Sequence, residues 1–190
     1  MFFVGFSGLF LFAVKKRTIH EMTRNRQCSM TSNEAIVHRF VNELWNAREL
    51  SVADEIFAPR CITHQLRSGE PVTSAPRDSQ TIKQHVLDWV NAFPDLQFTI
   101  EQTVASADRV ASHITMRGTH NGAWMGVSPT GKQISLTMIV IHRIDAQKIV
   151  EDWVLVDSLG LFQQLGLVGS REEIFSRIQP ENGSEATDFK

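Results

Sequence analysis

The stretch from Gln133 to Gly166 limits what this chain can fold into more than any other part of the sequence. In its first half, apolar residues recur at every second position, which is the period of a β-strand, and the positions between them are largely apolar as well. The alternating residues are Ile134, Leu136, Met138, Val140 and His142, with Ile139 and Ile141 between them. Because a strand that is apolar on both faces must be covered on both faces, this pattern predicts a buried strand.

A second buried strand and a short helix complete this stretch. The turn Asp145-Ala146-Gln147 leads into Lys148–Val156, where residue types again alternate with a period of two. Asp157 is placed to cap a helix at its N-terminus, and Gly166 follows the end of that helix as its C′ residue. Two buried strands followed by a helix predict a curved sheet around a cavity, and they argue against a nucleotide-binding fold.

Helical periodicity dominates the sequence before these strands. Ser32 is a candidate N-cap for a first helix, and Pro59 ends a second, shorter one. Asp78 or Ser79 caps a third helix, which Pro94 ends. The apolar stripes of the three helices are Ile36, Val37, Phe40, Val41 and Leu44; then Leu50, Ala53, Ile56 and Phe57; then Ile82, Val86, Trp89, Val90 and Phe93. Each helix is therefore expected to pack one face against a core.

The remaining segments are predicted to be extended pieces and loops. Cys61–Gln65 is a short extended segment, and Arg67–Asp78 contains the glycine, prolines and hydroxyl residues of a long loop that covers a site. Gln97–Val104 and Arg109–Gly118 have the strand period, and Thr119–Lys132 is a connection rich in Gly, Pro and Asn. Helices followed by an antiparallel sheet predict an α+β domain with the helices on one concave face.

The composition is that of an ordinary globular domain. Apolar residues make up 42% and charged residues 21%, and a formal charge of -2 provides no field that would attract nucleic acid. Cys28 and Cys61 have neither CxxC spacing nor paired histidines nearby, so we expect no disulfide framework and no metal site. Free thiols fit a reducing compartment, and we therefore expect a cytoplasmic protein.

We expect an N-terminal extension over residues 1–30, a domain over residues 31–168 and a C-terminal tail over residues 169–190. Met1–Val14 carries no charge, but it is shorter than the ~20 apolar residues that span a bilayer, so we expect no stable membrane insertion. Three interpretations stay open for this segment: a weak signal or anchor, a membrane-surface segment, and an extension from a start codon assigned too early. The third is favoured, because a helix start follows Met30 at once.

Four fragments together resemble a known family. They are AFPDLQF at Ala92–Phe98, GTHNGAWMGVSPTGK at Gly118–Lys132, KIVEDW at Lys148–Trp153, and D-x-x-G-x-x-x-QLG at Asp157–Gly166. In order and spacing the chain resembles the SnoaL-like polyketide cyclase (ester cyclase) family, whose wider nuclear-transport-factor-like group includes ketosteroid isomerases and scytalone dehydratases. The resemblance implies a cone-shaped, curved antiparallel sheet with three N-terminal helices around an apolar cavity, no cofactor, and commonly a homodimer through the sheet.

The chemistry that the resemblance implies is matched only in part. Cyclases of the family close a ring by intramolecular aldol condensation, and their acid/base aspartate lies three residues before the aspartate of D-x-x-G, where this chain has Val154. They place Gln and His on the preceding strand, where this chain has Met138 and Val140, and an Asn at the position of Thr63. A valine cannot move a proton, so this alignment removes the family's mechanism.

Two other residues are candidates for a base. Asp152 shares the strand face of Val154, where an apolar cavity would raise its pKa. The alternative is a carboxylate at the cavity mouth that pairs with Arg143 or Lys148. His64 belongs to the early extended segment that lines such cavities, and its alternative is a structural histidine bound to a backbone carbonyl.

The other polar and aromatic residues give weaker indications. Asp157 is explained by helix capping, and His120 by a role in a turn or at the surface. His113 and Arg117 share a strand face that lines either the cavity or a dimer partner. Trp124 lies in the loop best placed to act as a lid.

The sequence therefore supports two functions and a third role. The first is a cofactor-free enzyme that acts on a small hydrophobic, polyketide- or steroid-like compound; cyclisation, isomerisation, dehydration and hydrolysis each need one base in a dry pocket, here Asp152 or His64. The predicted lining of that pocket is Thr63, Trp124, Met138, Val140 and Val154. The second is a non-catalytic module that binds a lipid-like ligand or a partner. The third is a dimerisation scaffold whose own side chains fill the cavity.

Overall fold

The computed structural model describes residues 31–66 and 71–178. Its helices are α2 (Ser32–Arg39), the π-helix η1 (Phe40–Asn46), α3 (Val52–Ile56), α4 (Ser79–Ala92), α5 (Ser158–Leu165) and α6 (Arg171–Ile178). Its strands are β1 (Phe57–Leu66), β2 (Thr73–Arg77), β3 (Gln97–Ser106), β4 (Arg109–Thr119), β5 (Gln133–Asp145) and β6 (Lys148–Val156). Helices come first and most strands afterwards, which confirms the predicted α+β class.

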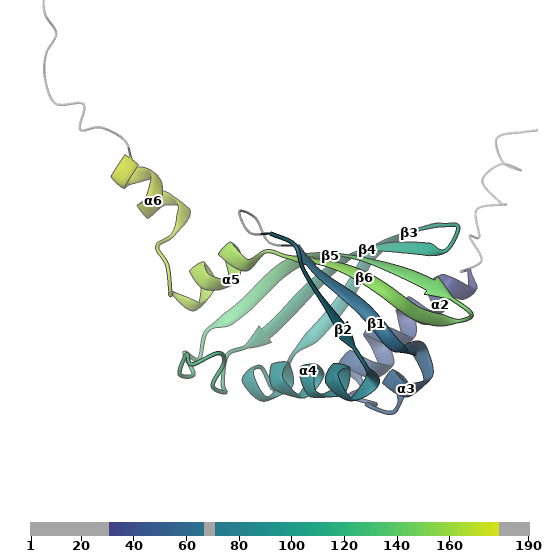
Figure 1. The fold of residues 1–190 in the computed structure, drawn as a ribbon. Coiled ribbons are helices and arrows are strands. Elements are labelled where there is room, and N and C mark those ends of the chain that lie inside the picture. The colour runs from purple at the N-terminus through teal and green to yellow at the C-terminus, as the bar shows by residue number, and fades with distance from the viewer. Residues whose placement is uncertain (1–30, 67–70, 179–190) are drawn as a thin grey trace, which may run out of the picture. The chain divides into compact units, whose positions relative to one another are not determined.

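The strands form one curved, open sheet in the order β2-β1-β6-β5-β4-β3 (Figure 1). Neighbouring strands are antiparallel except β1 and β6, which run parallel with Thr63 opposite Asp152. The expected antiparallel sheet thus contains one parallel pair. This pair joins the early extended segment to the last strand, and it brings together residues that are far apart in the sequence.

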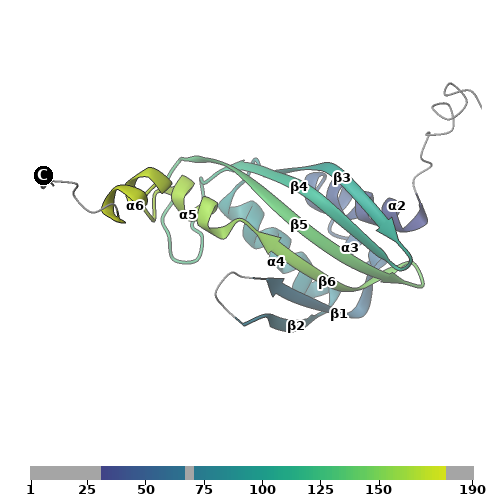
Figure 2. The same ribbon diagram turned by 90° about the horizontal axis from the view of Figure 1, so that it is seen from above.

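Helices α2, α3 and α4 cover one face of this sheet in both views (Figures 1 and 2). Their apolar stripes supply much of the core: Val37 and Leu44 on α2 and η1, Ile56 on α3 and Val86 on α4 are each 2% exposed or less. The strands contribute the alternate residues that face the helices, such as Leu136 of β5. Burial of these side chains is the main stabilising term, at roughly 1.5–3 kcal/mol for each large one.

The first predicted helix continues as a π-helix from Phe40 to Asn46. In an α-helix, positions five residues apart point roughly 140° away from each other, so Phe40 and Trp45 would diverge. The wider π turn repeats its hydrogen bonds at i→i+5 and brings the two rings toward one side, with their centroids 6.3 Å apart. Both rings can therefore contribute to the same internal surface.

Side chains cap the helix ends largely as the sequence predicts. Asp78 accepts a hydrogen bond from the backbone N–H of Thr81 at 2.8 Å, and Asp157 accepts one from Gly160 at 2.8 Å. Gly166 has the left-handed φ of 77° that suits a C′ glycine. The first cap is Thr31, one residue before the expected Ser32, because Thr31 forms a reciprocal capping box with the Glu34 side chain and backbone.

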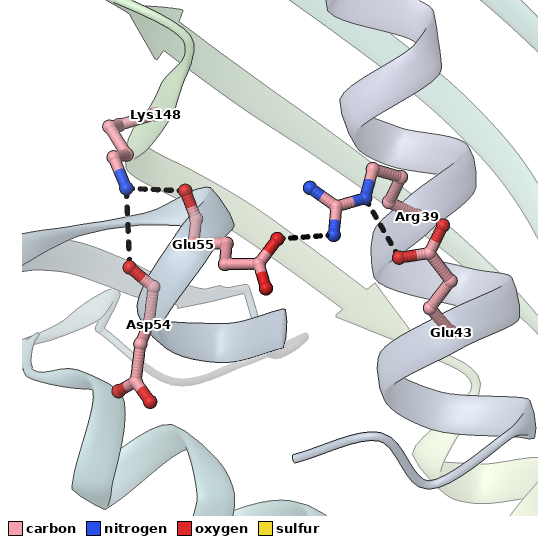
Figure 3. A network of polar contacts seen from close by, with 5 residues as sticks. All are labelled: Arg39, Glu43, Asp54, Glu55 and Lys148. Carbon is pink, nitrogen blue, oxygen red and sulfur yellow. Dashed lines mark hydrogen bonds and ion pairs between the residues drawn. The ribbon is translucent and has the colours of Figure 1, made fainter. Parts of the chain in front are cut away.

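A polar network ties the first helices to the last strand (Figure 3). Arg39 donates hydrogen bonds to the carboxylates of Glu43 at 2.8 Å and Glu55 at 2.6 Å. Lys148, the first residue of β6, donates to the backbone carbonyls of Asp54 and Glu55 at the end of α3. These contacts fix α3 against both η1 and β6.

Two elements lie where the sequence predicts loop or tail. Strand β2 occupies part of the predicted loop 67–78, and Pro76 is tolerated there because β2 is an edge strand that need not donate every hydrogen bond. Helix α6 lies within the predicted tail 169–190, and it begins with the acidic Glu172 and Glu173 in its first turn. Residues 1–30 and 179–190 lie outside the described residues, so the predictions for the N-terminal extension and the last residues are untested.

Candidate active site

A cavity of about 120 Å³ lies between the concave face of the sheet and helices η1 and α4. Its apolar wall is formed by Phe40, Val41, Trp45, Phe57, Ile82, Trp89, Phe98, Ile114, Met116, Met138, Val140, Val154 and Val156. Its polar lining residues are Thr63, Gln65, Arg77, His85 and Asp152. A mostly apolar wall with a few polar groups is the composition of a small-molecule site.

Asp152 is the carboxylate among the described lining residues, and it is 7% exposed. Burial raises its pKa from 3.8 to about 6, because a charged carboxylate is poorly solvated in such a wall. The hydroxyl of Thr63 on the neighbouring strand and the charge of Arg77 oppose this rise in pKa. Asp152 is therefore a carboxyl group whose pKa lies close to neutral pH.

Strand alternation decides which predicted residues reach the cavity. On β6, Asp152, Val154 and Val156 point inward, and on β5 Met138 and Val140 do so. The same alternation on β1 turns Thr63 and Gln65 inward and the residue between them outward. Hence the structure brings Thr63, Met138, Val140, Asp152 and Val154 to one wall.

His64 lies on the opposite face of the sheet, against the expectation that it lines the cavity. Its Nε2 is 2.8 Å from Glu151 Oε1, and its Nδ1 is 2.7 Å from Ser74 Oγ. The imidazole also stacks on the indole of Trp153, with the ring centroids 5.0 Å apart, and Arg143 donates to Glu151 at 2.8 Å. Because neighbouring residues of a strand point to opposite faces, His64 and Thr63 cannot both face the cavity.

His85 is a cavity residue that the sequence analysis did not select. Its ring lies between Trp45 and Trp89 of the wall, at centroid distances of 5.9 and 6.5 Å. Burial lowers its pKa to about 4, so the imidazole is neutral at pH 7 and can donate or accept a hydrogen bond. The signal was present, because His85 falls between Ile82 and Trp89 on the apolar stripe of α4.

Arg77 also lines the cavity and is not among the residues predicted to do so. It is the last residue of β2, in the segment predicted to be a loop, and it lines the cavity at its polar side. Cys61 lies opposite Arg77 in the β1–β2 register and is fully buried, which raises the pKa of its thiol to about 12. That thiol therefore stays protonated and unreactive at neutral pH.

A larger open groove adjoins the cavity and shares lining residues with it, namely Gln65, Arg77, His85, Trp89 and Val156. Trp124 lies in this outer groove rather than in the cavity wall. Its ring centroid is 5.4 Å from that of Trp89 on α4 and 6.5 Å from that of Phe162 on α5. The predicted lid residue thus lies in the groove that adjoins the cavity.

The remaining candidate residues, His113, Arg117 and His120, lie outside the cavity lining. His113 and Arg117 alternate with the inward-facing Ile114 and Met116 on β4, so they point to the outer face of the sheet. His120 is fully buried, with its Nδ1 3.1 Å from the hydroxyl of Thr130 at the far end of the same loop. Neither group reaches the cavity.

Within residues 31–66 and 71–178, no cluster of three or more His, Cys, Asp or Glu side chains is arranged to hold a metal ion. In the same part of the chain, no helix has the length and hydropathy needed to cross a membrane.

Comparison with known proteins adds a family to this geometry. A model of the SnoaL-like polyketide cyclase family matches residues 35–165. The solved structure of AclR, a proposed hydroxylase from Streptomyces galilaeus, is similar with a TM-score of 0.65 and 27% identity over 79% of this chain and 92% of AclR. IdmH, a proposed polyketide cyclase from Streptomyces antibioticus, has a TM-score of 0.61 and 28% identity over 72% and 99%. A proposed polyketide cyclase from Acidithiobacillus ferrooxidans has a TM-score of 0.63 and 27% identity over 73% and 97%. The search of curated proteins finds no match.

Proposed function

The chain belongs to the SnoaL-like polyketide cyclase family, and we propose that it is an acid/base enzyme that acts on a small hydrophobic compound without a cofactor. The proposed base is Asp152. The observation that carries this proposal is one carboxylate, 7% exposed, within an apolar wall that raises its pKa to about 6. Such a base is mostly ionised at pH 7, and it holds an abstracted proton better than an ordinary carboxylate does.

The proposed reaction begins at a carbon next to a carbonyl group. The carboxylate of Asp152 takes a proton from this carbon, and the electron pair of the C–H bond moves into the carbonyl to form an enolate. In a cyclase the enolate carbon then attacks a second carbonyl of the same molecule, and Asp152 gives its proton to the alkoxide that forms. In an isomerase Asp152 returns the proton to a different carbon. The neutral imidazole of His85 and the amide of Gln65 line the cavity and can donate hydrogen bonds to the enolate oxygen.

Proton abstraction can be tested without the natural substrate. The probe is 2-tetralone, a small bicyclic ketone whose α-hydrogens are exchanged for deuterium in D2O, and NMR measures the rate. We expect the full chain to accelerate this exchange and Asp152→Asn to reduce the acceleration by about 100-fold or more, because general-base catalysis supplies roughly that factor. The rate should fall in acid with a midpoint near the Asp152 pKa of about 6.

The matched control is Glu151→Gln. Glu151 is the preceding residue and also a carboxylate, but it points outward and binds His64 and Arg143. This variant should retain the wild-type exchange rate. An equal loss in both variants, or full activity in Asp152→Asn, would show that Asp152 is not the base.

A second candidate function is a non-catalytic module that binds a small hydrophobic ligand. The specific observation in its favour is Val154, an aliphatic residue in the cavity wall at the position where the sequence resemblance implies the family's acid/base aspartate. In that case 2-tetralone would bind with no acceleration of exchange in the wild type. The homodimer through the sheet remains a prediction for either function.

A further inference from the structure

Three buried polar residues form one straight row across the concave face of the sheet. The register of β1, β6 and β5 places Thr63 opposite Asp152, and Asp152 opposite His142. The three are 4%, 7% and 0% exposed. Residues that are directly opposite on neighbouring strands point to the same face, with Cβ atoms about 4.5–5.5 Å apart. Asp152 is therefore flanked by a hydroxyl on one side and an imidazole on the other.

The polar atoms of this row are only partly satisfied. Asp152 Oδ1 and both ring nitrogens of His142 are buried without a hydrogen-bond partner among the described residues. Leaving a buried polar group unpaired typically costs about 1–3 kcal/mol, so three such atoms on two facing residues require an explanation. At the Cβ separation of directly opposite residues, the imidazole and the carboxyl group are within reach of each other.

The surroundings of His142 keep its ring neutral. The ring of Phe40 lies over it at a centroid distance of 5.0 Å and an interplanar angle of 67°. The residue opposite it on β4 is Val110, and Ser112 is the neighbouring polar group on that strand. Burial lowers the His142 pKa to about 4. A neutral imidazole has one N–H donor and one acceptor nitrogen, so it can pair with a carboxylate or with a carboxylic acid.

We propose that His142 is a positioning residue for Asp152, pairing with its carboxyl group both before and after that group takes a proton. Before transfer, the imidazole N–H donates to the ionised carboxylate; after transfer, the same N–H donates to the carbonyl oxygen of the protonated carboxyl group, in a weaker hydrogen bond. His142 itself gains and loses no net proton. The role in catalysis rests on the proposed function of Asp152, whereas the pairing of the two side chains does not.

The charged and titratable groups around Asp152 come from three strands. Cys61 on β1 and Arg77 on β2 are on the cavity side, and His64 on β1 and Glu151 on β6 are on the outer side. None of these lies next to His142 in the register. A change at His142 therefore alters the carboxyl of Asp152 directly rather than through another charge.

The test is an NMR titration of the full chain with aspartate carboxyl and histidine ring labels. In the wild type, the ring nitrogen shifts of His142 should change with the midpoint of Asp152 titration while the ring stays neutral. His142→Leu removes the donor and should raise the Asp152 pKa by about one unit, a tenfold change in proton affinity, as expected for a lost hydrogen bond to a charged group. His142→Gln keeps a donor and an acceptor and should restore most of the wild-type pKa.

Ser112→Ala is the matched control, because Ser112 is buried and equally unpaired but lies in the next row, opposite Val140. It should leave the Asp152 pKa unchanged. If His142→Leu does not fold, the wild-type ring shifts and His142→Gln decide the question. The proposal would be overturned if the His142 ring nitrogen shifts do not change during the Asp152 titration. It would also be overturned if the Asp152 pKa is the same in His142→Leu as in the wild type.

The titration uses no substrate, so it is independent of the 2-tetralone assay. If the two residues titrate together but 2-tetralone exchange is not accelerated, the pairing is supported and the proposed enzyme function is rejected. If exchange is accelerated but the two residues do not titrate together, the enzyme function is supported and the pairing is rejected. In an active enzyme, His142→Leu should also move the acid limb of the exchange rate to higher pH by the same unit, which a purely structural defect would not do.

Discussion

Asp152 and Glu151 are neighbours in the chain, but they differ in the face of the sheet that they occupy and in the direction of their pKa shifts. Asp152 faces the apolar cavity, and burial raises its pKa to about 6. Glu151 faces outward, where hydrogen bonds from His64 and then Arg143 hold its pKa below the ordinary value. Two consecutive residues thus carry one carboxyl group whose ionisation is disfavoured by burial and one whose ionisation is favoured by hydrogen bonds.

This difference predicts how the stability of Asp152→Asn depends on pH. The carboxyl group binds its proton more tightly in the folded state, with a pKa of about 6, than in the unfolded state at 3.8. Its favourable contribution is therefore complete below pH 3.8 and is lost as the pH rises through 6. Above that pH, the buried charge costs the wild type about 3 kcal/mol, of which about 2 kcal/mol develops between pH 4.5 and pH 8.

Urea denaturation of both proteins at these two pH values measures the effect. The stability of Asp152→Asn relative to the wild type should increase by about 2 kcal/mol between pH 4.5 and pH 8. Glu151→Gln should show only a small change of the opposite sign over this range, because the stability that comes from its lowered pKa is lost mainly below the ordinary glutamate pKa of 4.5. A constant difference between Asp152→Asn and wild type would mean that Asp152 is not buried in solution.

Residue types and period-two alternation are enough to predict that Asp152 and Val154 share a face. They cannot decide how β1 is turned, since the segment from Cys61 to Gln65 is polar on both faces and its neighbours are distant in sequence. Either Thr63 or His64 could face inward, and the parallel pairing with β6 decides for Thr63. The sequence pattern indicates only that His142 is one more buried position of an apolar strand, and its place beside Asp152 appears only with the β5–β6 register.

At the scale of elements, the loop from His120 to Lys132 carries Trp124, which lines the outer groove. Its two ends are joined by hydrogen bonds between the backbones of His120 and Lys132 and of Gly131 and His120, both at 2.9 Å. The backbone N–H of Gly122 donates to the Ala92 carbonyl at the end of α4. The loop is thereby attached to the helix that carries the cavity-lining Trp89 and His85.

Gly122 is required by this attachment. A Cβ atom at this position would lie 1.8 Å from the Asn91 carbonyl oxygen, which is backbone and cannot move aside alone. Gly122→Ala should therefore displace the loop from α4 and destabilise the fold by about 1–3 kcal/mol, as overpacking does. Thermal unfolding and the emission spectrum of Trp124 measure the two effects, and Ala123→Ser, at an exposed neighbouring position, should change neither. An unaltered spectrum in Gly122→Ala would contradict the attachment.

Most helices and strands could be predicted because their signals are local: apolar periodicity, Asp78 and Asp157 as caps, and Gly166 as a stop. The π-helix could not, because no local signal distinguishes Phe40–Asn46 from a continued α-helix, and its wider turn depends on what the two aromatic rings contact. Strand β2 could not be predicted because its first four residues are exposed and include Pro76. Such a strand forms only because β1 is there to pair with it.

For the molecule as a whole, tryptophan side chains line both the cavity and the adjoining outer groove. Of the four tryptophans, Trp45 and Trp89 line the cavity, Trp89 and Trp124 line the groove, and Trp153 stacks on His64 at the other face. Uptake of a small apolar ligand should thus change the emission of the first three and leave that of Trp153 unchanged.

Fluorescence titration with 2-tetralone tests this prediction. Trp153→Phe should lose part of the total emission and keep the ligand-induced change, whereas Trp89→Phe should lose most of the change. The same response in both variants would mean that the ligand binds elsewhere. A response in Trp153→Phe but no proton exchange would favour the binding module over the enzyme.

The parallel pairing of β1 with β6 has a consequence for how the protein is made. Thr63 emerges from the ribosome long before Asp152, and β1 has no partner in the sheet other than β2 until β6 has been synthesised. Helices and the β3–β4–β5 hairpins can form earlier, because their contacts are local. The pairing of β1 with β6 therefore forms only when nearly the whole domain has been translated, and a nascent chain stopped before Asp152 would lack the proposed base.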